Sequence, residues 1–144
     1  MNAIVIVILA LLQVSWATAG GRSGGLMLRV AGGRSGGTFA VMTVNGFQKA
    51  EDSGGATACD GRFHSNDDLI VALSSGWYAG GKRCHKKIRI TSVQNRRTVE
   101  ATVVDECDSH HGCKNNIVDT SKAVWKKLGL DTDIGEVPVT WSDA

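Results

Sequence analysis

The chain has 144 residues, of which 21% are charged, and its formal net charge is +2 at pH 7. A charge this close to neutral argues against a nucleic-acid-binding module, because such modules carry a strongly basic surface. Residues 38–144 are enough for one hydrophobic core and no more.

The first residues predict secretion. Residues 3–12 form an unbroken apolar run, which is too short for a membrane span of about 20 residues. Ala17 and Ala19 then give the small-x-small pattern that signal peptidase needs. We predict a signal peptide over residues 1–19 and a secreted, extracellular protein with no membrane contact. A buried apolar helix or strand is the alternative.

A glycine-rich segment follows. The sequence AGGRSGG occurs twice, beginning at Ala19 and at Ala31. Glycine loses more entropy than any other residue when it becomes ordered, so this duplication favours a flexible tail. We predict the tail over residues 20–37 and a single folded domain over residues 38–144.

The folded part has the pattern of β-strands joined by turns. Apolar alternation and β-branched residues predict a hairpin around residues 94–97 and a short buried run that ends at Asp119. The other predicted strands cover residues 38–44, 69–73, 86–91, 98–104 and 137–141. Five or six short strands favour a mostly-β fold, either a small barrel or a sandwich.

One helix is predicted after Asp119. Thr120 and Ser121 are typical helix caps, and apolar residues then recur at helical spacing through residues 122–128. This spacing turns Trp125 toward the core. We expect Trp141, in the last strand, to be half-buried.

Four cysteines lie in the predicted mature chain. An even number in a small secreted protein predicts two disulfides, for which three pairings are possible. Metal binding is the alternative, because His85, His110 and His111 are close to cysteines. However, the C-x5-C spacing lacks the close cysteine pairs of structural zinc sites, so we expect no metal. The cysteines are Cys59, Cys84, Cys107 and Cys113.

Asp105 and Asp119 each follow an apolar run, and together they resemble the acid and base of a glycoside hydrolase. The structural alternative is that both carboxylates bind backbone N–H groups. Asp119 would then cap the predicted helix, which would lower its pKa, and Asp105 would end its strand by binding turn amides. We interpret both mainly as structural, and expect Asp119→Asn to cost some stability.

Two exposed segments are candidates for binding. Residues 74–81 form a predicted glycine-bounded loop with Trp77 and Tyr78, whose rings suit a sugar or protein contact. A second loop closes between Cys107 and Cys113. The remaining candidate contacts are Lys82, Arg83, Ser109, His110 and His111. The alternatives are that Trp77 packs on the core and that the basic residues, including Arg96 and Arg97, are simply solvated.

The ordered set of motifs resembles the kiwellin or ripening-related family of secreted plant proteins. The motifs are VMTVNGF, ACDGRFHSN, IVALSSGWYAGGKRC, KKIRIT, VEATVVDECDS, NNIVD, SKAVWKKLGLD and VTWSDA. The resemblance implies a six-stranded double-psi β-barrel with one short helix, similar to barwin and to the first domain of expansins. It also implies the pairs Cys59–Cys84 and Cys107–Cys113, and a role in plant defence in the apoplast.

The resemblance also bears on catalysis. Related double-psi barrels include endoglucanases and lytic transglycosylases, and Asp119 matches by position the acid of such barrels, while Asp105 matches another common aspartate. Endoglucanases take their base from the first strand, where this chain has Asn45. We therefore predict a non-catalytic monomer without cofactor that recognises an extracellular protein, such as a secreted pathogen protein. Cell-wall polysaccharide binding is the alternative, and weak glycan cleavage by Asp119 is less favoured.

Overall fold

A computed structural model describes residues 36–51 and 55–144. These residues include one compact unit, Gly37–Ala144. The predicted signal peptide, and the predicted tail up to residue 35, lie outside the described residues. Within the described part of the chain, no helix has the length and apolar character that crossing a membrane requires.

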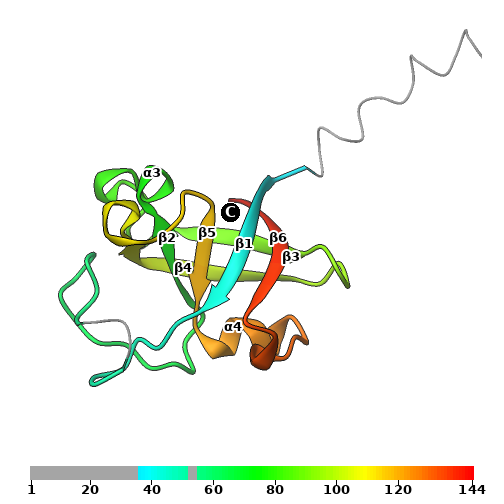
Figure 1. Ribbon diagram of the computed structural model, residues 1–144, viewed down its shortest axis with the longest axis horizontal. Helices are drawn as coiled ribbons and strands as arrows, with labels where there is room; N and C mark the ends of the chain where they lie inside the picture. The colour runs from blue at the N-terminus through cyan, green and yellow to red at the C-terminus, as the bar shows by residue number, and fades with distance from the viewer. Residues whose placement is uncertain (1–35, 52–54) are drawn as a thin grey trace, which may run out of the picture. The chain divides into compact units, whose positions relative to one another are not determined.

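Six strands and a few short helical turns make up the unit, as Figure 1 shows. The strands are β1 (Thr38–Val44), β2 (Ile70–Ser74), β3 (Lys87–Ser92), β4 (Thr98–Cys107), β5 (Ile117–Thr120) and β6 (Glu136–Asp143). The helices are α3 (Ser75–Tyr78) and α4 (Lys122–Lys127), with 3-10 turns η2 (Ala79–Gly81), η3 (Ser109–His111) and η4 (Thr132–Ile134). Every strand predicted within residues 38–144 is present, and β4 continues three residues past its predicted end at residue 104.

The strands close into a barrel in the order β1-β5-β2-β4-β3-β6. Two pairs, β1 with β5 and β2 with β4, are parallel, and the other four pairs are antiparallel. The predicted β3–β4 hairpin is confirmed, with Ile90 opposite Val99. A closed barrel leaves no free sheet edge, so the sandwich alternative is wrong.

The barrel interior holds the main hydrophobic core. Alternate residues of each strand point inward, as Met42, Ile88 and Val103 do, and all three are fully buried. Helix α4 closes one end of the barrel with Val124, Trp125 and Leu128, each 0% exposed. The prediction that Trp125 faces the core is therefore confirmed. Trp141 is only 4% exposed, so the expectation that it is half-buried is wrong.

The segment predicted as a loop at residues 74–81 is largely helical. It contains α3 and η2, joined at Ala79 and Gly80, which both have positive φ. The sequence did not predict this helix, because a single helical turn is too short to show a periodic pattern of apolar residues. Its last residue, Tyr78, is buried at 8% exposure.

Candidate functional site

The two candidate carboxylates lie in one row across four strands. Asp119 of β5 is in register with Thr43 of β1 on one side and with Ala72 of β2 on the other. Ala72 is in turn in register with Asp105 of β4. Neighbouring strands are about 5 Å apart, so the Cα atoms of the two aspartates are separated by roughly 10 Å.

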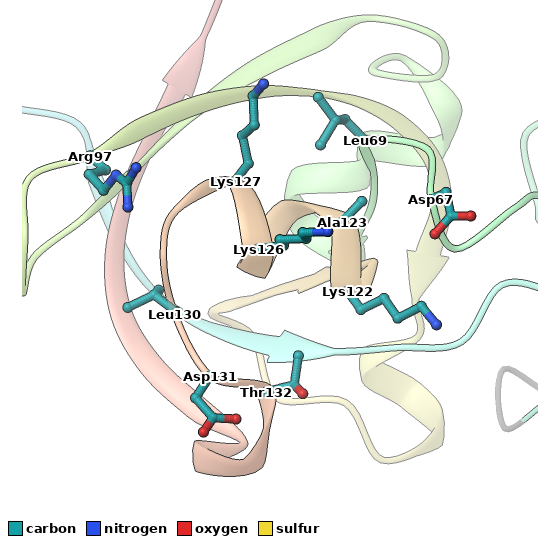
Figure 2. Close-up of a pocket in the computed structure, with 10 residues that line it drawn as sticks. All are labelled: Asp67, Leu69, Arg97, Lys122, Ala123, Lys126, Lys127, Leu130, Asp131 and Thr132. Atoms are coloured by element: carbon teal, nitrogen blue, oxygen red, sulfur yellow. The ribbon is translucent and has the colours of Figure 1, made fainter.

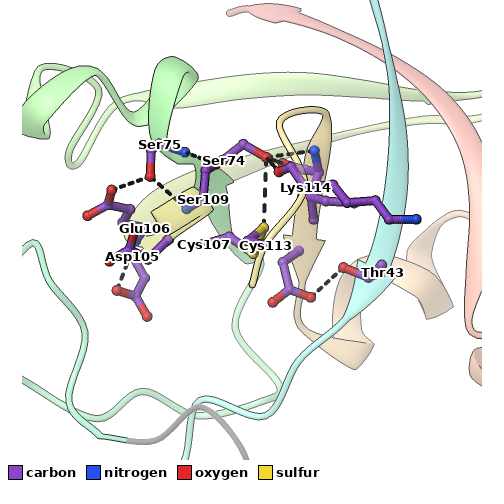
Figure 3. Close-up of a disulfide and its surroundings, with 12 residues drawn as sticks. Thr43, Ser74, Ser75, Asp105, Glu106, Cys107, Ser109, Cys113 and Lys114 are labelled. Atoms are coloured by element: carbon purple, nitrogen blue, oxygen red, sulfur yellow. Dashed lines mark hydrogen bonds between the residues drawn. A yellow bond between two sulfur atoms is a disulfide. The ribbon is translucent and has the colours of Figure 1, made fainter. Parts of the chain in front are cut away.

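Asp119 is held by a side chain far away in sequence. Thr43 Oγ1 donates a 2.6 Å hydrogen bond to Asp119 Oδ1, and Figure 3 draws this bond from Thr43. Burial raises the pKa of Asp119 and nearby Asp105 adds to the rise, while the bond from Thr43 opposes it. A raised pKa is what a general acid needs.

The interpretation of Asp119 as a helix cap is wrong. The residue at the N-cap of α4 is Ser121, and its side chain makes no capping bond. Ser121 Oγ instead donates to the backbone oxygen of Asp68 at 2.7 Å. The expected lowering of the Asp119 pKa is wrong for the same reason, because no helix amide stabilises the charged carboxylate.

Asp105 binds backbone amides, as the structural interpretation predicted. Its Oδ1 accepts hydrogen bonds from the N–H groups of Ala58, at 2.8 Å, and of Glu106, at 2.9 Å. Burial nevertheless raises the pKa of Asp105, and the two amide bonds counteract only part of this rise. The carboxylate thereby joins the segment around Ala58 to β4, which is a structural role.

A strap, which we define as residues 45–51 and 55–66, packs on the outside of the barrel near the aspartates. Its Phe47 is 0% exposed and belongs to a small outer cluster with Ile70, Ala72 and Val104. The Phe47 N–H donates to Asn66 Oδ1 at 2.8 Å, and this bond joins the beginning of the strap to its end. Because Ala72 is only 2% exposed, the surface between the two aspartates is covered rather than open.

The first strand brings no carboxylate to this row. Asn45 directly follows β1, and its backbone N–H donates to Thr120 O at 2.8 Å. The residue that the sequence reasoning missed is Thr43, the hydrogen-bond partner of Asp119. No sequence signal identifies it, since the pairing depends on the register between β1 and β5.

The second candidate region is the loop between Cys107 and Cys113, which we call the stapled loop. The structure joins these two cysteines, and joins Cys59 to Cys84, which is the pairing that the resemblance implies. No free cysteine occurs among the described residues.

Hydrogen bonds stiffen the stapled loop from inside. Asp108 Oδ1 accepts from the N–H of His110 at 2.8 Å, and Asp108 Oδ2 lies 2.7 Å from His111 Nδ1. The bond from the His110 amide, followed by the bond from His111, lowers the pKa of Asp108. The Cys113 N–H donates to Asp108 O at 3.1 Å. Asp108 therefore organises the loop that the disulfide closes.

Helix α3 fastens the stapled loop from outside, as Figure 3 shows. Ser75 Oγ donates to Glu106 Oε2 at 2.6 Å and accepts from the Ser109 N–H at 2.9 Å. Next to it, Ser74 Oγ donates to Lys114 O at 2.6 Å and accepts from the Ile117 N–H at 2.7 Å. The two imidazoles nevertheless project outward, with side-chain exposures of 85% for His110 and 80% for His111.

The aromatic candidates differ in accessibility. Trp77 is half-buried and packs edge-on against Trp141, with ring centroids 5.2 Å apart. Arg83 lies over the Trp141 ring at 5.0 Å and is held by Asp143. Tyr78 is buried, with its hydroxyl 3.4 Å from the Cys84 sulfur, so it is not available as a surface contact.

The predicted contacts therefore fall into two neighbouring groups. Ser109, His110 and His111 sit in the stapled loop, which hydrogen bonds join to α3. The second group consists of Trp77, which lies in α3, and of the exposed Lys82 and the half-buried Arg83, which follow it in the sequence. In the described part of the chain, no three His, Cys, Asp or Glu side chains are grouped so that they could hold a metal ion.

Comparison with known proteins identifies the family. A family model described as Kiwellin-1 matches residues 27–144. A ripening-related protein of rice (Oryza sativa subsp. japonica) is 72% identical over 109 residues, which cover 75% of this chain and 65% of that protein. Kiwellin from Actinidia chinensis var. chinensis is 52% identical over 117 residues, covering 74% of this chain and 54% of kiwellin. The chain belongs to the kiwellin family, and it spans about half to two thirds of the length of these relatives.

Solved structures identify the barrel type. An expansin of Clavibacter michiganensis is 25% identical with a TM-score of 0.59, covering 74% of this chain and 50% of the expansin. The Streptomyces papain inhibitor is 24% identical with a TM-score of 0.53, covering 75% of this chain and 96% of the inhibitor. With these neighbours, the predicted double-psi β-barrel is confirmed.

Proposed function

We propose that this kiwellin-family protein is a secreted, non-catalytic binding module that recognises an extracellular protein through the stapled loop and the neighbouring surface of α3. The observation that carries the proposal is the combination of rigidity and exposure in one loop. A disulfide and the bonds of Asp108 and Ser75 fix its backbone, while His110 and His111 stay in solvent. A preformed loop loses little conformational entropy on binding, which favours affinity.

The absence of catalysis is part of the proposal. The raised pKa of Asp119 would suit an acid, but an inverting hydrolase also needs a base that faces the same sugar. Asp105 already accepts two amide hydrogen bonds, Ala72 between the aspartates is covered, and β1 is followed by Asn45 instead of a carboxylate. These features support binding without bond cleavage.

The family supports the setting that we propose. We place the protein in the plant apoplast, released by cleavage of a signal peptide over residues 1–19, where it acts in defence as a monomer. A secreted protein of a pathogen is the proposed class of partner. N-terminal sequencing of the protein from extracellular fluid checks the processing, and an N-terminus at Met1 would contradict it.

The binding proposal is tested with a loop variant and a matched control. His110→Ala/His111→Ala removes the two exposed imidazoles, and Arg89→Ala/Glu100→Ala removes an exposed ion pair on the β3–β4 surface. Captures from extracellular fluid of infected tissue are compared by quantitative mass spectrometry, and the enriched protein is then purified for calorimetry. We expect the loop variant to lose at least about tenfold in affinity, which corresponds to about 1.4 kcal/mol. Equal affinity of the two variants for the purified partner would contradict the proposal.

A second candidate function is binding of cell-wall polysaccharide. One solved structure of the Clavibacter expansin contains cellohexaose, and its barrel resembles this one. The most exposed aromatic side chains of the described residues are Phe39 and Phe63, at 74% and 42% exposure. Binding to insoluble cellulose that Phe39→Ala/Phe63→Ala abolishes, with no protein partner captured, would favour this function. Release of reducing ends that Asp119→Asn abolishes would instead favour the enzyme.

A further inference from the structure

A hollow lies beside α4, at the end of the barrel opposite to α3. Figure 1 places α4 and α3 at opposite ends of the sheet. The hollow has a volume of about 1020 Å³, at the upper limit of typical ligand pockets. Figure 2 shows its lining side chains, which come from α4, from Asp67 and Leu69, from Arg97 at the β3–β4 turn and from residues 130–132. The binding surface proposed above involves none of these residues.

The helical period directs lysines into this hollow. Val124, Trp125 and Leu128 occupy the face of α4 that is buried in the core. Lys122 and Lys126, one turn apart, and Lys127 lie on the opposite face, where all three are exposed and line the hollow. Because the apolar face of α4 is buried in the core, the face that carries the lysines is turned toward the hollow.

The fourth cation that lines the hollow is Arg97, which comes from the β3–β4 turn and not from α4. Arg97 packs against Gly129, where φ is +71° and where any Cβ would overlap the guanidinium. The turn that carries Arg97 is tied to the end of α4 by Asn95 Nδ2, which donates to Leu128 O at 2.8 Å. The arginine is thus anchored beside the lysine face.

These cations have few compensating charges. Within residues 36–51 and 55–144, no ion pair involves Arg97, Lys122, Lys126 or Lys127. Among the residues that the structure describes, two carboxylates line the hollow, those of Asp67 and Asp131, and Asp131 already accepts from the Asp133 N–H at 2.9 Å. Four cations against two carboxylates give an excess of +2, equal to the net charge of the entire chain.

Apolar side chains lie between the cations. Leu69, Ala123 and Leu130 are each partly buried and line the hollow, and Leu69 and Leu130 also pack on the barrel core. An apolar floor with a cationic rim suits a ligand with both carboxylates and aliphatic groups. A polyuronate offers the carboxylates with little apolar surface, whereas an acidic peptide with leucines offers both.

We propose that this hollow is a docking site for an acidic, leucine-containing peptide segment of a partner protein. The carboxylates of the segment lie against the lysines of α4 and against Arg97, and its aliphatic side chains cover Leu69 and Leu130. This goes beyond the function proposed above, because it assigns recognition to a different surface. Either site is able to function without the other.

The test uses a fluorescent peptide of repeated Glu-Glu-Leu units and the full mature chain. Fluorescence anisotropy measures binding, with repeated Gln-Gln-Leu and Glu-Glu-Ser peptides as matched probes. We expect both matched probes to bind at least about tenfold more weakly. Lys122→Glu/Lys126→Glu should weaken binding of the Glu-Glu-Leu peptide by a similar factor. Lys86→Glu/Lys87→Glu changes the net charge equally at another exposed cationic site, and it should change the affinity less than about twofold.

Each other outcome contradicts the proposal. Equal loss in both charge variants would mean unspecific attraction by net charge. Equal binding of the Glu-Glu-Ser peptide would remove the role of the apolar floor, and tight binding of polygalacturonate without the peptide would identify a glycan site. Circular dichroism of both variants ensures that a lost affinity is not a lost fold, and the His110→Ala/His111→Ala variant should bind the peptide like the wild type.

Discussion

The two ends of the barrel are ordered by different forces. At the α4 end, Trp125 and Leu128 are buried in the core, and α4 is held there by apolar packing. At the α3 end, no residue between Cys107 and Cys113 belongs to a buried cluster, and the loop is held by the disulfide and by hydrogen bonds to Ser75 and Asp108. A polar, exposed loop of this kind is held rigid by cross-links and satisfied hydrogen bonds, because its side chains are not buried in a core.

Trp125→Ala should have the largest effect on stability, because it removes a core side chain at the α4 end of the barrel. The side chain is fully buried, and removal of a large aromatic core residue costs about 3–5 kcal/mol of unfolding free energy. The hydrogen bond from its Nε1 to Thr43 O, at 3.2 Å, is lost as well. Guanidinium unfolding measures the change. Phe39→Ala, at a side chain that is 74% exposed, is the control and should cost less than about 0.5 kcal/mol.

Removal of the disulfides should give a graded and smaller effect. The Cys59–Cys84 bond spans 25 residues and the Cys107–Cys113 bond spans 6. The chain-entropy model then predicts losses of about 3.5 and about 2 kcal/mol for the paired Cys→Ser variants. Hydrogen exchange should show the second loss mainly in the stapled loop, with the barrel amides still protected. A global loss of protection in Cys107→Ser/Cys113→Ser would mean that the two ends are not independently ordered.

Asp119→Asn should have the smallest effect, at a residue on β5, the strand between the two ends. The amide side chain that this change introduces keeps an oxygen for the bond from Thr43 and carries no buried charge. We therefore expect the free energy of unfolding at pH 7 to stay equal or to rise, because the buried charge is removed while the bond from Thr43 is kept. The change should be smaller than those of Trp125→Ala and of the disulfide variants. The helix-cap interpretation predicted the opposite result, a loss of stability in Asp119→Asn.

The stability difference between the wild type and Asp119→Asn should depend on pH. The pKa of Asp119 is higher in the folded protein than in the unfolded chain. At a pH between these two pKa values, the folded protein therefore binds more protons than the unfolded chain. Its contribution to stability therefore increases as the pH falls through this window. Asp60 and Asp143 have lowered pKa values and act in the opposite direction. The quantity to measure is the difference between wild type and Asp119→Asn, which should shrink on acidification; a growing difference would contradict the buried-acid description.

The local pattern of the chain was sufficient for most elements. Alternation predicted the β3–β4 hairpin, helical spacing turned Trp125 inward, and Gly129 follows the end of α4 with positive φ. The motifs also led to the kiwellin family and to the double-psi barrel. The errors occurred where a neighbour distant in the sequence decides the environment, as for Trp141, which Trp77 and Arg83 cover.

Local periodicity and the ordered motifs of the sequence are enough to locate the strands and α4 and to indicate the family. The hydrogen bond and the raised pKa of Asp119 depend on the folded barrel, since Thr43 is 76 residues away and the burial that raises this pKa arises when the barrel closes. The same holds for the hollow beside α4. Its lysines are visible in the sequence, but their alignment with Arg97 over Leu69 and Leu130 exists only after the core fixes the face of the helix.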